Sequence, residues 1–530
     1  MSSSDETRIV GAFSPFAHTA FALLWTATLI SNIGTWMHDV GAGWLMTTLD
    51  PTPAVVTLVQ AATTLPVFLF ALLAGTLADR FDKRRMLIII NLVMAVVVSA
   101  LAILVWQERM TPILLILFTL AIGTGAAFMA PAWQAVVPGL IPRDKLKPAI
   151  ALNSMGINIS RAIGPAVAGV LIASVGLASP FALNAASYMV ILAALILWKP
   201  SDLPSRKTHG SLLSEMRTGL RHVRHNPAML ATAVRALAFF LFASAYWSLL
   251  PLIARNANGG GSELYGILMA LIGTGAVIGA LLLPRLSRRF DADMTVRIGT
   301  VGTMAALLAM ALSDAPFALM LAAFAGGLSW IAVLTSFNVS AQTALPNWVR
   351  ARGLAVFLMV FFGSMSLGSV VWGQIATILS ITAALIMASA GLLLGMVVTR
   401  KFTVGQGEGM DLDPASAWPK APPLAEGQSS DRAAMVLVTY KIEPSDRDEF
   451  VALLQDFSKE RMRDGAMRWD ITQCVEEPEM WTEVFHLPSW AEHLEQHARA
   501  TKSDIDLQDR IKKLDRHDGG PVVRHYLKPD

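Results

Sequence analysis

Ionisable side chains interrupt apolar stretches of this sequence that are long enough to cross a lipid bilayer. His38 and Asp39 stand in the first stretch, Arg161 in the fifth and Arg235 near one end of the seventh. An ionisable group inside a membrane span is costly and therefore points to function. The candidates for proton coupling are Asp39, His38 and Arg161, and we predict that Asp39 carries the proton. His38 either shares that proton or only lies at the membrane interface, and we expect Arg235 to snorkel to lipid headgroups. Asp39 at the outer membrane surface remains an alternative, because 20 helical residues from Thr19 span about 30 Å.

The surrounding composition is typical of a membrane protein. Apolar residues make up 54% of the chain, charged residues 15%, and the mean hydropathy is +0.52, whereas soluble domains carry about a quarter charged residues. A membrane-spanning helix needs about 20 apolar residues, and this criterion predicts about twelve helices. Their expected limits are 18–46, 53–78, 86–107, 112–138, 147–173, 177–198, 228–254, 263–284, 294–313, 315–341, 352–377 and 380–400.

Basic residues are concentrated in every second joint between these stretches. Arg84, Lys145 and Arg288 belong to basic joints, whereas the opposite joints offer only Arg109 and Arg255. Basic loops stay in the cytoplasm. We therefore expect a multi-pass protein of the bacterial inner membrane with both termini in the cytoplasm.

A weak internal repeat divides the helices into two halves. Gly75, Arg84 and Arg85 recur 204 positions later as Gly279, Arg288 and Arg289, and paired six-helix halves are common in transporters. We expect an all-α membrane bundle of two six-helix halves followed by a small α+β domain. The expected segments are the N-terminal half at 1–198, a cytoplasmic connector at 199–227, the C-terminal half at 228–402, a flexible linker at 403–432 and the α+β domain at 433–530.

We call the last segment the tail. Its strand-like and helix-like patterns follow one another in the order β-α-β-β-α-β, which predicts a ferredoxin-like fold. Expected strands are Met435–Tyr440, Met467–Val475, Met480–Leu487 and Val522–Tyr526, with helices at Pro444–Met462, from Ser489 and at Ser503–Leu514. His493 and His497 lie four residues apart and would share one helix face, as metal ligands can. We favour solvated histidines there, and we expect no metal site, no catalytic residue and no cofactor. The single cysteine, Cys474, excludes an intrachain disulfide.

The joint after the second stretch carries the most specific motif, Gly75-Thr-Leu-Ala-Asp-Arg-Phe-Asp-Lys-Arg-Arg85. It resembles the Gly-x-Leu-Ala-Asp-Arg-x-Gly-Arg-Arg signature of the major facilitator superfamily, with Asp82 where the family usually has glycine. The resemblance implies a gate, in which the acidic residue pairs with a neighbouring helix and locks the outward-facing state; a charge pair at a helix end suits such a latch. A simple stop-transfer cluster is the alternative. The implied gate residues are Gly75, Asp79, Arg80, Arg84 and Arg85.

Other segments extend the resemblance over nearly the whole chain. Gly164, Pro165 and Gly169 resemble the Gly-Pro motif of superfamily antiporters, where small residues let helices approach closely and proline bends them. The segments 31–37, 43–46 and 58–66 resemble the transmembrane secretion effector branch, which has enterobactin-exporter-like members. The tail, with Arg468-Trp469-Asp470 and Ser489 to His497, is similar to the cytoplasmic appendage of long members and resembles the antibiotic-biosynthesis-monooxygenase fold.

The resemblance implies a secondary active transporter that works by alternating access rather than an enzyme. We expect proton-coupled efflux of a small amphipathic molecule, such as a siderophore or a drug-like compound. The expected partners are that substrate, membrane lipid and protons, with no nucleic acid. Two hypotheses for the tail stay open: a cofactor-free oxygenase-like enzyme, or a module that makes the transporter a homodimer.

Overall fold

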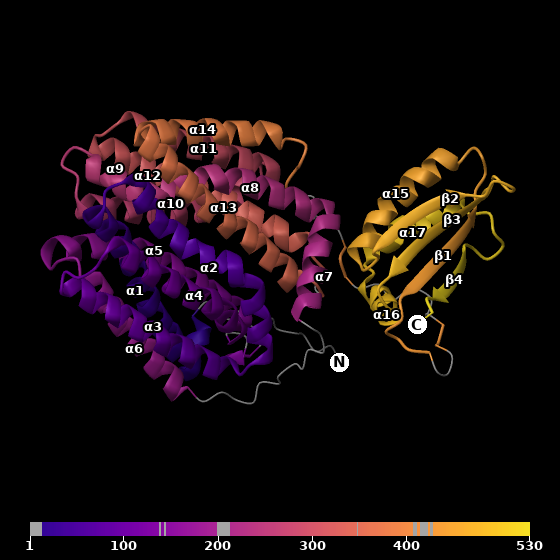
Figure 1. Ribbon diagram of the computed structural model, residues 1–530, viewed down its shortest axis with the longest axis horizontal. Coiled ribbons are helices and arrows are strands. Elements are labelled where there is room, and N and C mark those ends of the chain that lie inside the picture. Colours follow the sequence, from indigo (N-terminus) through magenta and orange to yellow (C-terminus); the bar gives the residue numbers. More distant parts are fainter. Residues whose placement is uncertain are drawn as a thin grey trace, which may run out of the picture. The chain divides into compact units, whose positions relative to one another are not determined.

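The protein divides into two compact units. The computed structural model describes residues 13–136, 139–142, 145–198, 212–346, 348–405, 411–413, 422–424 and 428–529. The first unit comprises Met1–His209, Val234–Phe337 and Phe357–Phe402, and the second comprises Gly210–Ala233, Asn338–Val356 and Thr403–Asp530. Within the described ranges, twelve helices are long and apolar enough to cross a membrane (Figure 1). The expected helical membrane bundle is thus confirmed.

Helices account for most of the described residues before position 400. They are α1 (Thr19–Leu49), α2 (Pro53–Arg80), α3 (Lys83–Trp106), α4 (Pro112–Val136), α5 (Leu146–Ser174), α6 (Ser179–Leu197), α7 (Leu212–His225), α8 (Pro227–Ser248), α9 (Leu250–Asn256), α10 (Ser262–Leu286), α11 (Ala292–Leu312), α12 (Pro316–Thr343), α13 (Arg350–Ile378) and α14 (Ile381–Val398).

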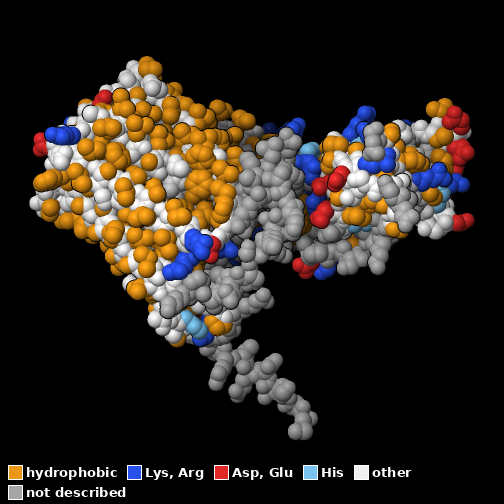
Figure 2. Space-filling model, turned by 60° about the horizontal axis from the view of Figure 1, so that its bottom comes forward, with side chains coloured by type: hydrophobic (Ala, Val, Ile, Leu, Met, Phe, Trp, Pro, Cys, Tyr) orange, Lys and Arg blue, Asp and Glu red, His pale blue; other side chains and the backbone are white. Residues whose placement is uncertain are grey.

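Local sequence explains where several helices begin. Pro53, Pro112, Pro227 and Pro316 are each the first helical residue, a position where the missing N–H leaves no hydrogen bond unmade. In the first unit, α1 packs against α5 and α6, α2 against α4, and α10 against α5. Hydrophobic side chains cover much of the face of the helical unit that Figure 2 shows. Such a surface is costly in water but suits contact with lipid.

The tail contains a four-stranded antiparallel sheet in the order β2-β3-β1-β4. Because β3 lies between β1 and β2 and is antiparallel to both, β1 and β2 run parallel, as in a ferredoxin-like fold. Alternate residues of β1 are buried under α15, whose Phe450 and Phe457 belong to the same core. The elements are β1 (Ala434–Lys441), α15 (Arg447–Arg463), β2 (Arg468–Gln473), β3 (Met480–Leu487), α16 (Trp490–Arg499), α17 (Lys502–Leu514) and β4 (Val522–Leu527).

Candidate functional site

The polar residues of α1 face two different neighbours. His38 is buried against α6, with its ring 4.9 Å from that of Phe181 in an edge-on arrangement. Neither ring nitrogen of His38 has a hydrogen-bond partner among the described residues. An imidazole in such surroundings is a candidate for binding a polar ligand or a water molecule.

Asp39 lies where α1 meets helices of both halves. Its carboxylate is close enough to interact electrostatically with the hydroxyl groups of Tyr188 on α6 and Tyr265 on α10. Both tyrosines are buried, and Tyr265 also stacks on Trp44 at 6.2 Å between ring centroids. Neither tyrosine could be singled out from the sequence, because both follow Asp39 by more than a hundred residues.

The side chain of Arg161 on α5 contacts α1 about one helical turn from Asp39. Its guanidinium carbon lies 5.4 Å from the centroid of the Trp36 ring, within the range of a cation–π contact. The Nε atom of Arg161 is buried and has no hydrogen-bond partner in the described part of the chain. The structure thus places Arg161 beside the predicted proton-carrying segment of α1.

Close glycine contacts join the two halves. A Cβ atom added to Gly266 would lie 2.7 Å from the Pro165 carbonyl oxygen and 2.8 Å from Gly169 Cα, and one added to Gly273 would lie 2.8 Å from the Arg161 carbonyl oxygen. We call this α5–α10 contact, made by Gly169, Gly266 and Gly273, the glycine seam. Gly164 faces the other way, towards Trp36 of α1. The Gly-Pro motif therefore packs against a helix on each side, as small residues allow in membranes.

A second contact between the halves involves α2 and α13. The Ala54 amide donates to Thr377 Oγ1 at 2.8 Å, and Ser366 Oγ donates to the Ala61 carbonyl at 3.3 Å. Both hydrogen bonds lie towards the Pro53 end of α2. In the glycine seam, the contact between Gly169 and Gly266 lies nearest the Ser262 end of α10. The Pro53 end of α2 and the Ser262 end of α10 both lie on the side opposite the basic joints.

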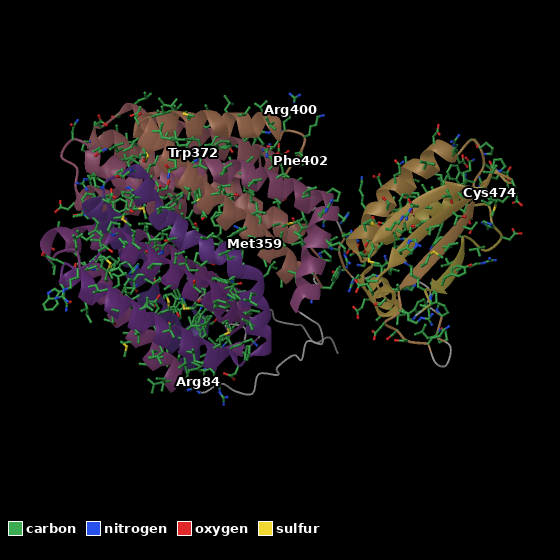
Figure 3. All side chains as sticks on the ribbon, viewed as in Figure 1. Arg84, Met359, Trp372, Arg400, Phe402 and Cys474 are labelled. Carbon is green, nitrogen blue, oxygen red and sulfur yellow. The ribbon has the colours of Figure 1, made fainter. Side chains whose placement is uncertain are left out.

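The gate motif surrounds the junction between α2 and α3. The side chains of Asp79 and Arg80 lie outside the described residues, and a Cβ at Gly75 would meet nothing within 4 Å. Arg84, which is labelled in Figure 3, lies at the edge of the helical unit. It donates to the Leu195 and Ile196 carbonyl oxygens at 2.9 and 2.8 Å. It thus satisfies carbonyls at the C-terminus of α6, where a cation is favourable.

Asp82, the departure from the family signature, has a clear local role. It is the N-cap of α3 and accepts a hydrogen bond from the Arg85 amide at 2.7 Å. Its φ of −61° needs no glycine. The substitution therefore replaces a flexible residue with a helix cap.

Arg235 does not snorkel to headgroups, so that expectation was wrong. It is 4% exposed, and its Nη2 atom lies 3.4 Å from Asp293, which also pairs with Arg297 at 2.7 Å. Asp293 stands in the first turn of α11, where an acidic side chain is favourable. The pair joins α8 to α11 inside the C-terminal half.

The tail core contains a buried carboxylate, Glu483, with three donors. Arg461 Nε donates to it at 3.1 Å, Trp469 Nε1 at 3.0 Å and the Tyr440 hydroxyl at 3.2 Å. The Arg461 guanidinium lies between the rings of Phe457 and Phe485. Glu483 is fully buried, so these contacts replace the water that the charge would otherwise require.

Three histidine rings meet beside this core. The ring of His493 lies 4.7 Å from that of His497 and 4.9 Å from that of His525. His493 is 2% exposed, so the expectation of solvated histidines was wrong for this residue. Burial, and then its charged neighbours, lowers the pKa of His493 to about 3 and keeps the ring neutral. No group of three or more His, Cys, Asp or Glu in the described ranges could hold a metal ion.

In the second unit, α7 and the residues before α13 contact the tail. Glu492 on α16 accepts from Arg221 at 3.0 Å and from Arg499 at 2.6 Å. Arg499 lies over the Trp348 ring at 4.7 Å, and His222 meets the same ring edge-on at 5.4 Å. We call these five residues the tail clamp. Burial, with nearby Arg463, Arg221 and Arg499, lowers the pKa of His222 to about 2.

Comparisons with known proteins agree with this architecture. The family described as transmembrane secretion effector matches residues 10–530. The staphyloferrin A transporter of Staphylococcus aureus (strain NCTC 8325 / PS 47) is 26% identical over 263 residues, which cover 49% of this chain and 66%, just under two thirds, of that protein. The enterobactin exporter of Shigella boydii serotype 4 (strain Sb227) is 25% identical over 292 residues, covering 55% of this chain and 69% of that protein.

Solved structures show the same fold. The nucleoside transporter NupG superposes with a TM-score of 0.60 and 13% identity, over 72% of this chain and 99% of that one. At this identity the likeness concerns the fold alone.

Proposed function

Because the chain belongs to the transmembrane secretion effector family, we propose that it exports a small amphipathic molecule, a siderophore or a drug-like compound, in exchange for protons. The names of the staphyloferrin A transporter and the enterobactin exporter support the siderophore class. The basic joints support an inner-membrane protein with both termini in the cytoplasm.

The observation that carries this proposal is the position of Asp39. It lies on α1 where tyrosines from α6 and α10, one from each half, come close to its carboxylate. The 31 residues of α1 are about 46 Å long, about 16 Å more than the hydrocarbon core. If that excess is shared equally between the two ends of α1, Asp39 lies about 7 Å inside the hydrocarbon. A carboxylate at this depth and at this boundary can couple its protonation to movement of the halves.

The contacts between the halves support an inward-open state. The glycine seam and the α2–α13 hydrogen bonds hold the halves together at the ends opposite the basic joints. In the proposed orientation these ends face the periplasm. Alternating access would then require α5 and α10 to separate while the cytoplasmic ends close.

Everted vesicles loaded with a proton gradient test the role of Asp39, with enterobactin and staphyloferrin A as probes. Asp39→Asn should abolish transport driven by the gradient and leave exchange of substrate at equilibrium intact. Asp50→Asn, which removes a carboxylate just beyond the end of α1, is the matched control. Proton dependence that survives Asp39→Asn would exclude this residue from coupling. Failure of the wild-type protein to transport either probe would exclude these two siderophores as its substrates.

The buried histidines favour a second function, small-molecule binding or oxygenase-like chemistry in the tail. His493 and Gln496 are both at most 2% exposed, so an imidazole and an amide side chain lie buried inside the tail, next to the rings of His497 and His525. Turnover of the exported compound by the full-length protein, lost in His493→Ala, supports this function. The dimer hypothesis is tested by crosslinking the full chain, a chain ending at residue 410, and a Glu492→Gln variant that loses the contact with Arg221 but keeps the tail.

A further inference from the structure

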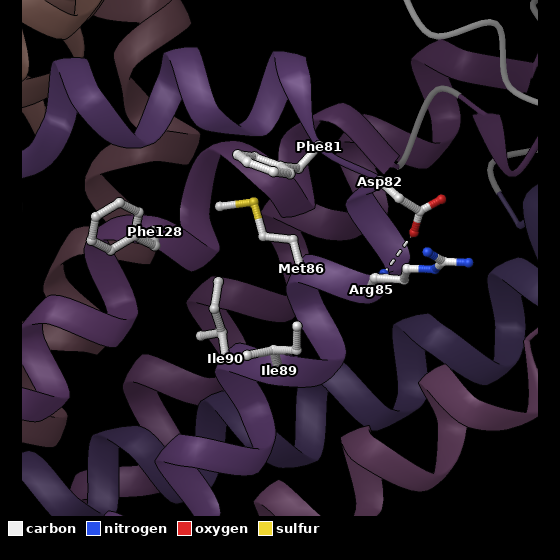
Figure 4. Close-up of a pocket in the computed structure, with 7 residues that line it drawn as sticks. All are labelled: Phe81, Asp82, Arg85, Met86, Ile89, Ile90 and Phe128. Atoms are coloured by element: carbon white, nitrogen blue, oxygen red, sulfur yellow. Dashed lines mark hydrogen bonds between the residues drawn. The ribbon is translucent and has the colours of Figure 1, made fainter.

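A groove opens at the start of α3, near the gate motif. It has a volume of about 370 Å³ and is lined by Phe81, Asp82, Arg85, Met86, Ile89, Ile90 and Phe128 (Figure 4). The first two turns of α3 form one wall and Phe128 of α4 the other. Phe81 and Ile89 are each 61% exposed. The groove is therefore accessible from outside the bundle and is mostly apolar.

The charged lining residues, Asp82 and Arg85, both stand at one end of the groove. The Asp82 carboxylate is engaged as the cap of α3, and Arg84 is engaged with the α6 carbonyls. Arg85 is exposed, and its guanidinium makes no hydrogen bond or ion pair with the residues that the structure describes. Arg85 is thus the cation that lines the groove. This end of the groove therefore suits an anion, which the positive N-terminus of α3 also favours.

The other end continues into an apolar stripe on α3. Ile89, Val93 and Val96 follow one another at helical spacing and are 61%, 54% and 63% exposed. The distance from Met86 to Val96 along the helix is about 15 Å, comparable to much of an acyl chain. A cationic end joined to such a stripe matches a molecule with an anionic headgroup and a hydrocarbon chain.

We propose that this groove binds an anionic phospholipid of the cytoplasmic leaflet. The phosphate lies on Arg85, and an acyl chain lies along Met86, Ile89 and Ile90 against Phe128. The site rests on the orientation in the proposed function, because it requires this joint to be cytoplasmic. A lipid held here contacts both α3 and α4 beside the gate motif, so it would affect the helices that the gate must move.

The test uses the full-length protein in detergent, titrated with phosphatidylglycerol or phosphatidylcholine, with thermal unfolding as the readout. A ligand that binds the native state raises its unfolding temperature. We expect phosphatidylglycerol to protect and phosphatidylcholine to protect much less. Arg85→Gln should raise the half-saturating phosphatidylglycerol concentration about tenfold, the usual worth of a charge-assisted hydrogen bond. Ile89→Ala, at an exposed position, should raise it about threefold.

Arg289→Gln is the matched control, because Arg289 is the counterpart of Arg85 in the other half. Equal protection by the two lipids, or equal loss in Arg85→Gln and Arg289→Gln, would overturn the site. Glycerol phosphate carries the anion without the chain; if it protects as well as the lipid, the groove binds a free phosphate and the lipid proposal fails. Transport by wild-type protein in phosphatidylcholine vesicles is measured separately. Intact efflux there, without any lipid-specific protection, would reject the lipid site and leave the proposed export function standing.

Discussion

The glycine seam predicts how one added methyl group will alter the balance between conformations. In Gly266→Ala the new Cβ would lie 2.7 Å from the Pro165 carbonyl oxygen and 2.8 Å from Gly169 Cα. Both are backbone atoms, so no side-chain rotation relieves the clash and α5 and α10 must move apart. Overpacking of this kind costs about 1–3 kcal/mol. The population of the state in which α5 and α10 are separated should therefore rise about 5- to 150-fold relative to the state in which the glycine seam is closed.

Distances between spin labels measure this change directly. Cys474 is the only cysteine, so Cys474→Ser gives a clean background for labels at Val175→Cys and Asn256→Cys, near the ends of α5 and α9. Gly266→Ala should enrich the longer distances. Gly261→Ala is the control, because its Cβ would meet nothing within 4 Å and its φ of 179° suits any residue. An unchanged distance distribution in Gly266→Ala, or the same change in Gly261→Ala, would refute the role of the seam.

Three further predictions concern the tail of the full-length protein. Arg461→Met should lower the free energy of unfolding of the tail by about 3–5 kcal/mol in urea titrations, because it leaves Glu483 buried without its cation; Lys459→Met, at an exposed ion pair, should change it little. Burial, and then Asp504, raises the pKa of Glu460 to about 9, so the native tail keeps a proton that the unfolded chain releases above its ordinary pKa. The stability of the tail should fall as pH rises from about 4.5 to 9, and Glu460→Gln should flatten this dependence in thermal unfolding. Trp348→Ala removes the ring that Arg499 and His222 contact and should speed amide hydrogen exchange in α7 by about tenfold; unchanged exchange would contradict the clamp.

The sequence was most informative where a regular pattern repeats. Long apolar stretches predicted the twelve spans, since only helices of this length cross a bilayer. Alternation predicted the ferredoxin-like tail. Glu483 stands within the alternating buried run of β3, between Trp481 and Phe485, so its burial was accessible from the sequence. Its partners were not, because Tyr440 and Arg461 come from separate elements whose packing the pattern does not specify.

The residues of the candidate site were harder to predict from the sequence, because the site is formed by helices that are far apart along the chain. Nothing near Asp39 marks Tyr188 or Tyr265 as neighbours. Arg235 looked like a headgroup contact because it lies near a helix end, and only the packing of α8 on α11 brings Asp293 to it. The Gly-Pro motif did mark a helix contact, but not which helix would supply Gly266 and Gly273.

The tail clamp has a practical consequence for anyone who shortens this protein. Ending the chain before the tail would strip Glu492 from Arg221 and uncover the Trp348 ring. The shortened protein would then lack the tail, expose the apolar Trp348 ring and leave Arg221 without its carboxylate partner. Poor yield or altered behaviour of such a protein would reflect that damage as much as any lost tail activity, so point changes at Glu492 make the cleaner comparison.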